Sequence, residues 1–83
     1  MNVKTKLNKI ENIYGIDIYK LVKEINKYIR NTYHTKKIYV ELDESDTTLN
    51  LMNDKTMKYY TLKYWNVGYG NCVFDTMELE KYL

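Results

Sequence analysis

The chain of 83 residues has no proline, no alanine and a single cysteine, Cys72. One cysteine cannot form an internal disulfide, so packing must stabilise the fold and we expect a reducing compartment. No apolar run approaches the roughly 20 residues of a membrane helix, and the N-terminus lacks the apolar stretch of a signal peptide. We therefore expect a cytoplasmic protein that does not enter a membrane.

Arginine is nearly absent as well, since Arg30 stands against 12 lysines. Lys, Asn, Ile and Tyr supply 38 of the 83 residues, and these are the amino acids of A/T-rich codons. The composition therefore indicates an A/T-rich genome, such as that of a low-GC bacterium, its phage or a plasmid. The same codon bias raises the tyrosine count, so aromatic content alone says little about function.

What is present indicates one globular domain over residues 1–83, because 45% of the residues are hydrophobic and 29% are charged. The net charge of +2 is unevenly distributed, with a balance of +6 in residues 1–40 and −4 in residues 41–83. Such polarity favours oriented docking on a charged partner, although ordinary solvated charge gives the same pattern.

Hydrophobic spacing predicts two N-terminal helices. Apolar residues at helical spacing indicate the first over residues 3–14, with Gly15 as its stop. The second is capped by Asp17 and continues to about residue 33, with one apolar stripe.

After Lys37 the period changes to two, which predicts antiparallel strands at 38–42, 49–52, 57–66 and, as a short fourth strand, 72–74. A closing helix is expected over 76–82, with Asp75 and Glu78 as a capping box. The predicted fold class is α+β: two N-terminal helices, an antiparallel meander of three to four strands and a short C-terminal helix, with the long helix packed on one face of the sheet.

The aromatic strand 57–66 has two faces. Tyr60, Leu62 and Tyr64 form the better core face, whereas the opposite face carries aromatics beside polar groups, as protein contact surfaces do. The residues predicted to contact a partner are Tyr59, Lys63, Trp65, Tyr69 and Tyr39. A simply solvated face is the alternative, and stacking of nucleic-acid bases would need more basic residues around the aromatics.

A second candidate surface is a basic helix face, because cationic side chains recur at spacings of three and four. Its members are Lys20, Lys23, Lys27, Arg30 and His34. Such a face can follow a phosphate backbone or an acidic protein groove, or it can be solvated. Residues 3–30 also permit a helix-turn-helix interpretation, with the turn at Tyr14, Gly15 and Ile16.

Enzyme chemistry finds little support, and we predict a protein that is not an enzyme. His34 and Cys72 are single and lie on different predicted elements, and the acidic turn 43–46 does not match a full calcium loop. No zinc pattern and no phosphate-binding glycine loop are present in the sequence. We therefore predict neither a metal nor a cofactor.

These features favour a small protein-binding module, encoded by a phage or mobile element, that acts as a stoichiometric inhibitor of a host macromolecule. Its expected partner is a host protein or ribonucleoprotein, such as a defence nuclease inhibited in the manner of an anti-CRISPR protein. One alternative is a nucleic-acid-binding regulator that uses the basic helix face. The other is a homo-oligomeric structural protein, so the chain is expected to be a monomer or a homodimer.

Overall fold

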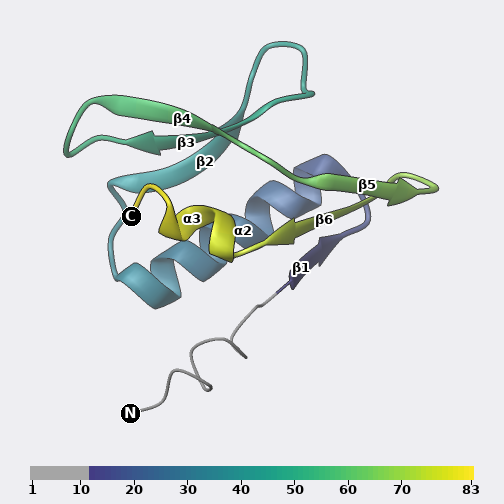
Figure 1. The fold of residues 1–83 in the computed structure, drawn as a ribbon, viewed down its shortest axis with the longest axis horizontal. Coiled ribbons are helices and arrows are strands. Elements are labelled where there is room, and N and C mark those ends of the chain that lie inside the picture. Colours follow the sequence, from purple (N-terminus) through teal and green to yellow (C-terminus); the bar gives the residue numbers. More distant parts are fainter. Residues whose placement is uncertain (1–11) are drawn as a thin grey trace.

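The computed structural model describes residues 12–83, which form two helices and six strands (Figure 1). In chain order these are β1 (Asn12–Gly15), α2 (Ile18–Tyr33), β2 (Ile38–Leu42), β3 (Leu49–Asn53), β4 (Lys58–Leu62), β5 (Trp65–Gly68), β6 (Asn71–Asp75) and α3 (Met77–Glu80). The strands make two antiparallel sheets: a first sheet in the order β1-β6-β5 and a second sheet in the order β2-β3-β4. The mixed α+β class is therefore confirmed, and β2-β3-β4 is an antiparallel meander of three strands as predicted. The expected fourth strand does not extend this meander, because β6 lies in the first sheet.

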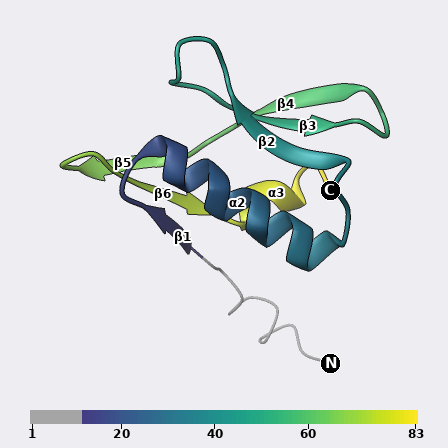
Figure 2. The ribbon, with the colours of Figure 1, turned by 180° about the vertical axis from the view of Figure 1, so that it is seen from behind.

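The long helix α2 is confirmed, and it packs against strands of both sheets, β1 and β6 of the first and β2 of the second (Figure 2). The carboxylate of Asp17 accepts a hydrogen bond of 2.8 Å from the backbone N–H of Lys20, which caps the first turn. The helix ends at His34, where the backbone turns left-handed (φ 54°) and the N–H still reaches the carbonyl of Arg30. No helix within residues 12–83 combines the length and the apolar character needed to cross a bilayer.

The prediction of a first helix is wrong for residues 12–14, and its remaining part lies outside the described residues. Asn12–Gly15 instead forms β1, in which Ile13 pairs with Phe74 and Gly15 pairs with Cys72 of β6. A Cβ on Gly15 would lie 2.7 Å from the backbone nitrogen of Leu21, so the glycine allows β1 to approach α2 closely rather than stopping a helix. The helix-turn-helix interpretation fails for the same reason.

The predicted strand 57–66 is also wrong as one element. The second sheet ends at Leu62, the chain crosses at Lys63 and Tyr64, and Trp65 begins β5 in the first sheet. The expected fourth strand is longer than predicted, since β6 covers Asn71–Asp75, and it is the central strand of the first sheet.

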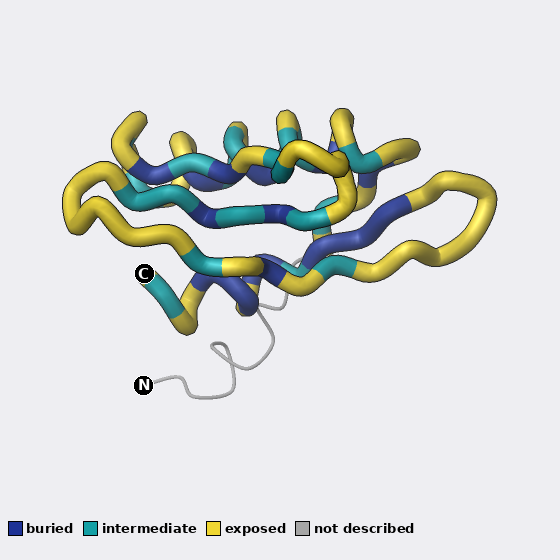
Figure 3. Tube along the Cα trace, turned by 90° about the horizontal axis from the view of Figure 1, so that it is seen from above, coloured by how far each residue is buried: buried dark blue, intermediate teal, exposed yellow. Residues whose placement is uncertain are grey.

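Both sheets, α2 and α3 contribute to one hydrophobic core. In the second sheet the predicted alternation is confirmed, because Leu51 and Leu62 are buried while Tyr59 and Thr61 on the opposite face are exposed (Figure 3). Tyr60 also points inward, where its ring stacks on Tyr82 beyond α3 at a centroid distance of 4.5 Å. The buried core consists of Leu21, Ile25, Ile29, Ile38, Val40, Leu49, Leu51, Leu62, Cys72, Phe74 and Leu79.

A side chain of α2 covers the free edge of β2 at Val40. The amide of Asn26 donates to the carbonyl of Val40 at 3.0 Å and accepts from its N–H at 2.7 Å. An edge strand otherwise leaves such groups unpaired or open to pairing with another chain. Asn26 therefore both aligns the helix with the second sheet and protects the edge of that sheet.

We expect Asn26→Ala to lower the free energy of unfolding by about 1–3 kcal/mol, because it leaves two partly buried backbone groups of Val40 without their partner. Urea denaturation followed by circular dichroism measures the change. Asn31→Ala is the matched control, since Asn31 is an exposed asparagine of the same helix. Equal effects of the two substitutions would contradict a structural role for the Asn26 amide.

Candidate functional site

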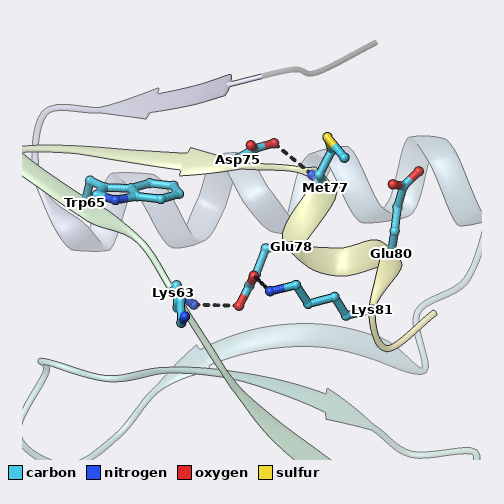
Figure 4. A pocket seen from close by; sticks show the side chains of 7 residues that line it. All are labelled: Lys63, Trp65, Asp75, Met77, Glu78, Glu80 and Lys81. Carbon is cyan, nitrogen blue, oxygen red and sulfur yellow. Dashed lines mark hydrogen bonds and ion pairs between the residues drawn. The ribbon is translucent and has the colours of Figure 1, made fainter. Parts of the chain in front are cut away.

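The crossing between the two sheets is held by Glu78 of α3. Its carboxylate is only 8% exposed, accepts a hydrogen bond of 3.0 Å from the backbone N–H of Lys63, and lies 2.9 Å from the ammonium of Lys81 (Figure 4). Burial raises the pKa of Glu78, but the hydrogen bonds from Lys81 and Lys63 and their charges outweigh burial, so the pKa lies below its ordinary value. The side chain is therefore ionised at neutral pH.

This arrangement corrects the predicted capping box. The cap position of α3 is taken by Thr76, and Asp75 accepts a hydrogen bond of 2.9 Å from the backbone N–H of Met77. Glu78 turns instead toward the crossing, as described above. The C-terminal helix is present but shorter than predicted, Met77–Glu80. It places Leu79 in the core and Glu78 beside the backbone of Lys63.

Trp65 lies immediately after this crossing and forms one side of a hollow of about 530 Å³. Asp75, at the end of β6, and Met77 and Glu80 of α3 lie around the same hollow (Figure 4). Side chains of both charge signs line it, so it has no uniform electrostatic character. Glu78 lines the same hollow as Trp65, and we call its bonds to Lys63 and Lys81 the Glu78 clamp.

The first sheet presents large apolar side chains to solvent. On the outer face, Tyr14 of β1 and Trp65 of β5 stand on either side of Val73 of β6, which is itself buried. Phe74 and Cys72 of β6 lie in the core. A hollow of about 400 Å³ is lined by Tyr14, Ile16 and Val67 among others. We define the apolar surface of the first sheet as Tyr14, Ile16, Trp65, Val67 and Tyr69.

The side chains of this apolar surface are largely exposed to solvent. Tyr14, Ile16, Trp65 and Val67 retain 52–67% of their accessible area, and Tyr69 is fully exposed. Tyr69 stands at the tip of the hairpin between β5 and β6, where Gly68, Tyr69 and Gly70 have positive φ of 100°, 54° and 77°. The glycines permit this tight turn at little steric cost, and the turn presents the tyrosine ring away from the core.

The structure divides the five residues predicted to contact a partner. Trp65 and Tyr69 belong to the apolar surface of the first sheet, and Lys63 lies beside it at the crossing. Tyr39 and Tyr59 instead lie on the outer face of the second sheet, where Met52 stands between them.

Tyr14, Ile16 and Val67 are the members that the sequence prediction missed. Tyr14 was assigned to a helix, whereas the segment alternates between an inward Ile13 and a buried Gly15 on one side and the exposed Tyr14 and Ile16 on the other. This alternation of inward and exposed residues is the sequence signal that indicates a strand at this position.

The basic helix face is exposed along its whole length. Lys20, Lys23, Lys27, Arg30 and His34 all lie opposite the buried stripe of Leu21, Ile25 and Ile29. Within residues 12–83 the ion pair formed is that between Lys81 and Glu78, so no member of the basic face is ion-paired with a described carboxylate.

Reactive groups are few in the described part of the chain. Cys72 is buried, and burial, together with the charge of Asp17, raises the pKa of its thiol, which disfavours the nucleophilic thiolate. In the acidic turn, Asp43 accepts hydrogen bonds from Ser45, Thr47 and Thr48 and thereby orders the loop. Residues 12–83 contain no group of three or more His, Cys, Asp or Glu side chains placed to hold a metal ion.

We expect Glu78→Gln to lower the free energy of unfolding at pH 7 by about 1 kcal/mol, since Lys81 is largely exposed and solvent screens the lost ion pair. Folding lowers the pKa of Glu78 below its ordinary value of 4.5, so the ionised carboxylate stabilises the folded protein when the pH is above 4.5. This stabilisation is lost as the pH falls through the lower pKa that Glu78 has in the folded protein. The difference between the two proteins should therefore disappear in acid. Urea unfolding at pH 7 and near pH 3 measures it.

Glu80→Gln serves as the control, because Glu80 is an exposed carboxylate of the same helix. A pH-independent difference between wild type and Glu78→Gln would contradict the assignment of the clamp to an ionised Glu78.

Comparison of the chain with models of protein families, with curated proteins and with solved structures finds no match. The surfaces described above are the observations from which a function can be proposed.

Proposed function

We propose that the protein is a small binding module that docks on a protein partner through the apolar surface of the first sheet. The observation that carries the proposal is the exposure of Tyr14, Trp65, Val67 and Tyr69 on one sheet and its hairpin. Contiguous exposed apolar area on a small protein commonly marks an interaction site. Tyrosine and tryptophan are also the side chains that most often dominate the energy of protein interfaces.

The surface is suited to binding because most of its side chains are carried by paired strands. Trp65 is flanked by the crossing that Glu78 holds, and Tyr14 is tied to β6 by the register with Val73. A preordered surface loses less conformational entropy on binding than a flexible loop. Complete burial of each large apolar side chain contributes about 1.5–3 kcal/mol, so a few such residues can supply most of a binding free energy.

In this proposal the protein is a stoichiometric inhibitor from a phage or mobile element that covers a surface of a host protein or ribonucleoprotein, such as a defence nuclease. Its support is the small size and the A/T-rich composition of the chain. A small rigid module with an open apolar face can act by occluding a surface or blocking a conformational step. The genes that neighbour the coding sequence test this part, and a locus unrelated to phage or mobile elements would contradict it.

Self-association is the competing use of the same surface. Sedimentation velocity over a range of concentrations separates the two, because the proposal predicts a monomer in the absence of a partner. A homodimer that dissociates on substitution of Trp65 would instead assign the surface to contacts between two copies of the chain.

To identify the partner, a photo-crosslinking amino acid is placed at Val67 and the crosslinked protein is recovered from cells. The partner is then purified for binding measurements. We expect the double substitution Tyr14→Ala and Trp65→Ala to weaken binding of the purified partner at least 100-fold, because hot-spot aromatics cost about 2 kcal/mol or more each. Titration calorimetry measures both affinity and the expected 1:1 stoichiometry.

The matched control is the double substitution Met57→Ala and Tyr59→Ala, since both side chains are highly exposed but belong to the second sheet and its turn. The proposal predicts unchanged affinity for this control. If the Tyr14 and Trp65 variant still binds and the control variant does not, the partner contacts the second sheet and the proposal is wrong.

A further inference from the structure

We propose a second binding surface: the basic helix face of α2 binds the phosphate backbone of double-stranded nucleic acid without reading its sequence. This surface lies on the side of α2 that faces away from the core. It adjoins the apolar surface of the first sheet at one end, because Lys20 shares a hollow with Tyr14 and Val67. The other members of the row, from Lys23 to His34, line no part of that hollow.

The spacing of the cations suits a dense line of negative charge. Lys20 and Arg30 are ten residues apart, which is about 15 Å along a helix with a rise of 1.5 Å per residue. Neighbouring members three or four residues apart lie about 5–6 Å from each other. A duplex carries one phosphate charge per about 1.7 Å of its axis, so every cation of the row finds a phosphate within reach.

The charges on this face are available for a ligand. No member of the row from Lys20 to Arg30 forms an ion pair with a described residue. Glu24 is half-buried beside the row, where it shares a hollow with Lys27 and Tyr28, but it forms no ion pair with the described lysines. At the N-terminal end, the carboxylate of Asp46 accepts a hydrogen bond from the hydroxyl of Tyr19 and forms no ion pair with the row.

The C-terminal end of the row adds groups that bind phosphate. Arg30 lines a small hollow of about 170 Å³ together with Thr35 and Lys36. The hydroxyl oxygen of Thr35 accepts a hydrogen bond of 3.1 Å from the backbone N–H of Lys37, which leaves its own hydrogen free to donate. The hollow is therefore lined by a guanidinium, an ammonium and a hydroxyl group. Phosphate oxygens accept hydrogen bonds from all three.

A duplex fits this face better than a single strand or an acidic protein. Single-strand binding relies on aromatic side chains on which bases stack, and the row contains none. Of the tyrosines of α2, Tyr28 and Tyr33 pack against the core, and Tyr19 is exposed with its hydroxyl bonded to Asp46. An acidic protein would have to present carboxylates at the spacing of the row, whereas a duplex carries phosphates along its whole length.

The test is fluorescence anisotropy of the full chain with a labelled 20-base-pair duplex of mixed sequence, and with one of its strands alone. We expect duplex binding at low salt that weakens about 100-fold between 50 and 200 mM salt, as four phosphate contacts imply. The substitutions Lys23→Glu and Lys27→Glu together should abolish detectable binding, whereas duplexes of unrelated sequence should bind equally well.

The matched control is Lys55→Glu with Lys58→Glu, because it brings the net charge from +2 to −2 as the test variant does, but on exposed residues of the second sheet and its turn. The proposal predicts that this control keeps affinity within about threefold of wild type at moderate salt, where long-range attraction is screened. Circular dichroism of both variants verifies that they fold.

The proposal is overturned by absence of duplex binding at low salt, by equal losses in the two variants, or by tighter binding of the single strand. Absence of duplex binding, combined with loss of the protein partner in the Lys23 and Lys27 variant, would assign the basic helix face to an acidic protein instead.

Discussion

The carboxylate of Glu78 is the interaction on which the arrangement of the two sheets depends. It accepts the backbone N–H of Lys63 at the point where the chain leaves one sheet for the other, and Lys81 balances its charge. An unpaired carboxylate this deeply buried would be costly, and an unpaired N–H would be too. The two groups satisfy one another only if α3 lies beneath the crossing, so the short helix, the crossing and Trp65 are positioned together.

Two further contacts fix the position of α2 against the two sheets. The absence of a side chain on Gly15 lets β1 lie against Leu21 of α2, and the amide of Asn26 attaches the same helix to β2. The helix is therefore fixed to both sheets along its inner face, which leaves its outer face to solvent. Two surfaces result from one scaffold: an apolar one on the first sheet and a cationic one on α2.

Much of this fold is predictable from local sequence. Asp17 and the apolar stripe identify α2, and the alternation of apolar and polar residues identifies the second sheet and its inward face. The first sheet is not predictable in this way, because β1 pairs with a strand about sixty residues later and no local pattern records that pairing. The alternation also continues through Lys63 and Tyr64, so it cannot reveal that the chain changes sheets there.

The candidate site shows the same limit. Trp65 and Tyr69 could be selected because exposed aromatics on a strand and turn suit a contact surface, but their neighbours could not. Tyr14 joins Trp65 only through the long-range register with Val73, whereas Tyr59, six residues from Trp65 in sequence, lies on a different sheet. Proximity in sequence therefore grouped residues that the topology separates.

The most direct measurement is an NMR titration of the isotope-labelled protein with the purified partner, observed at the indole N–H of Trp65. This resonance is unique, because the chain contains one tryptophan. The account predicts that it shifts together with the backbone signals of Tyr14, Val67 and Tyr69 as a 1:1 complex forms. An unchanged indole signal, with shifts confined to Tyr39, Met52 and Tyr59, would contradict it.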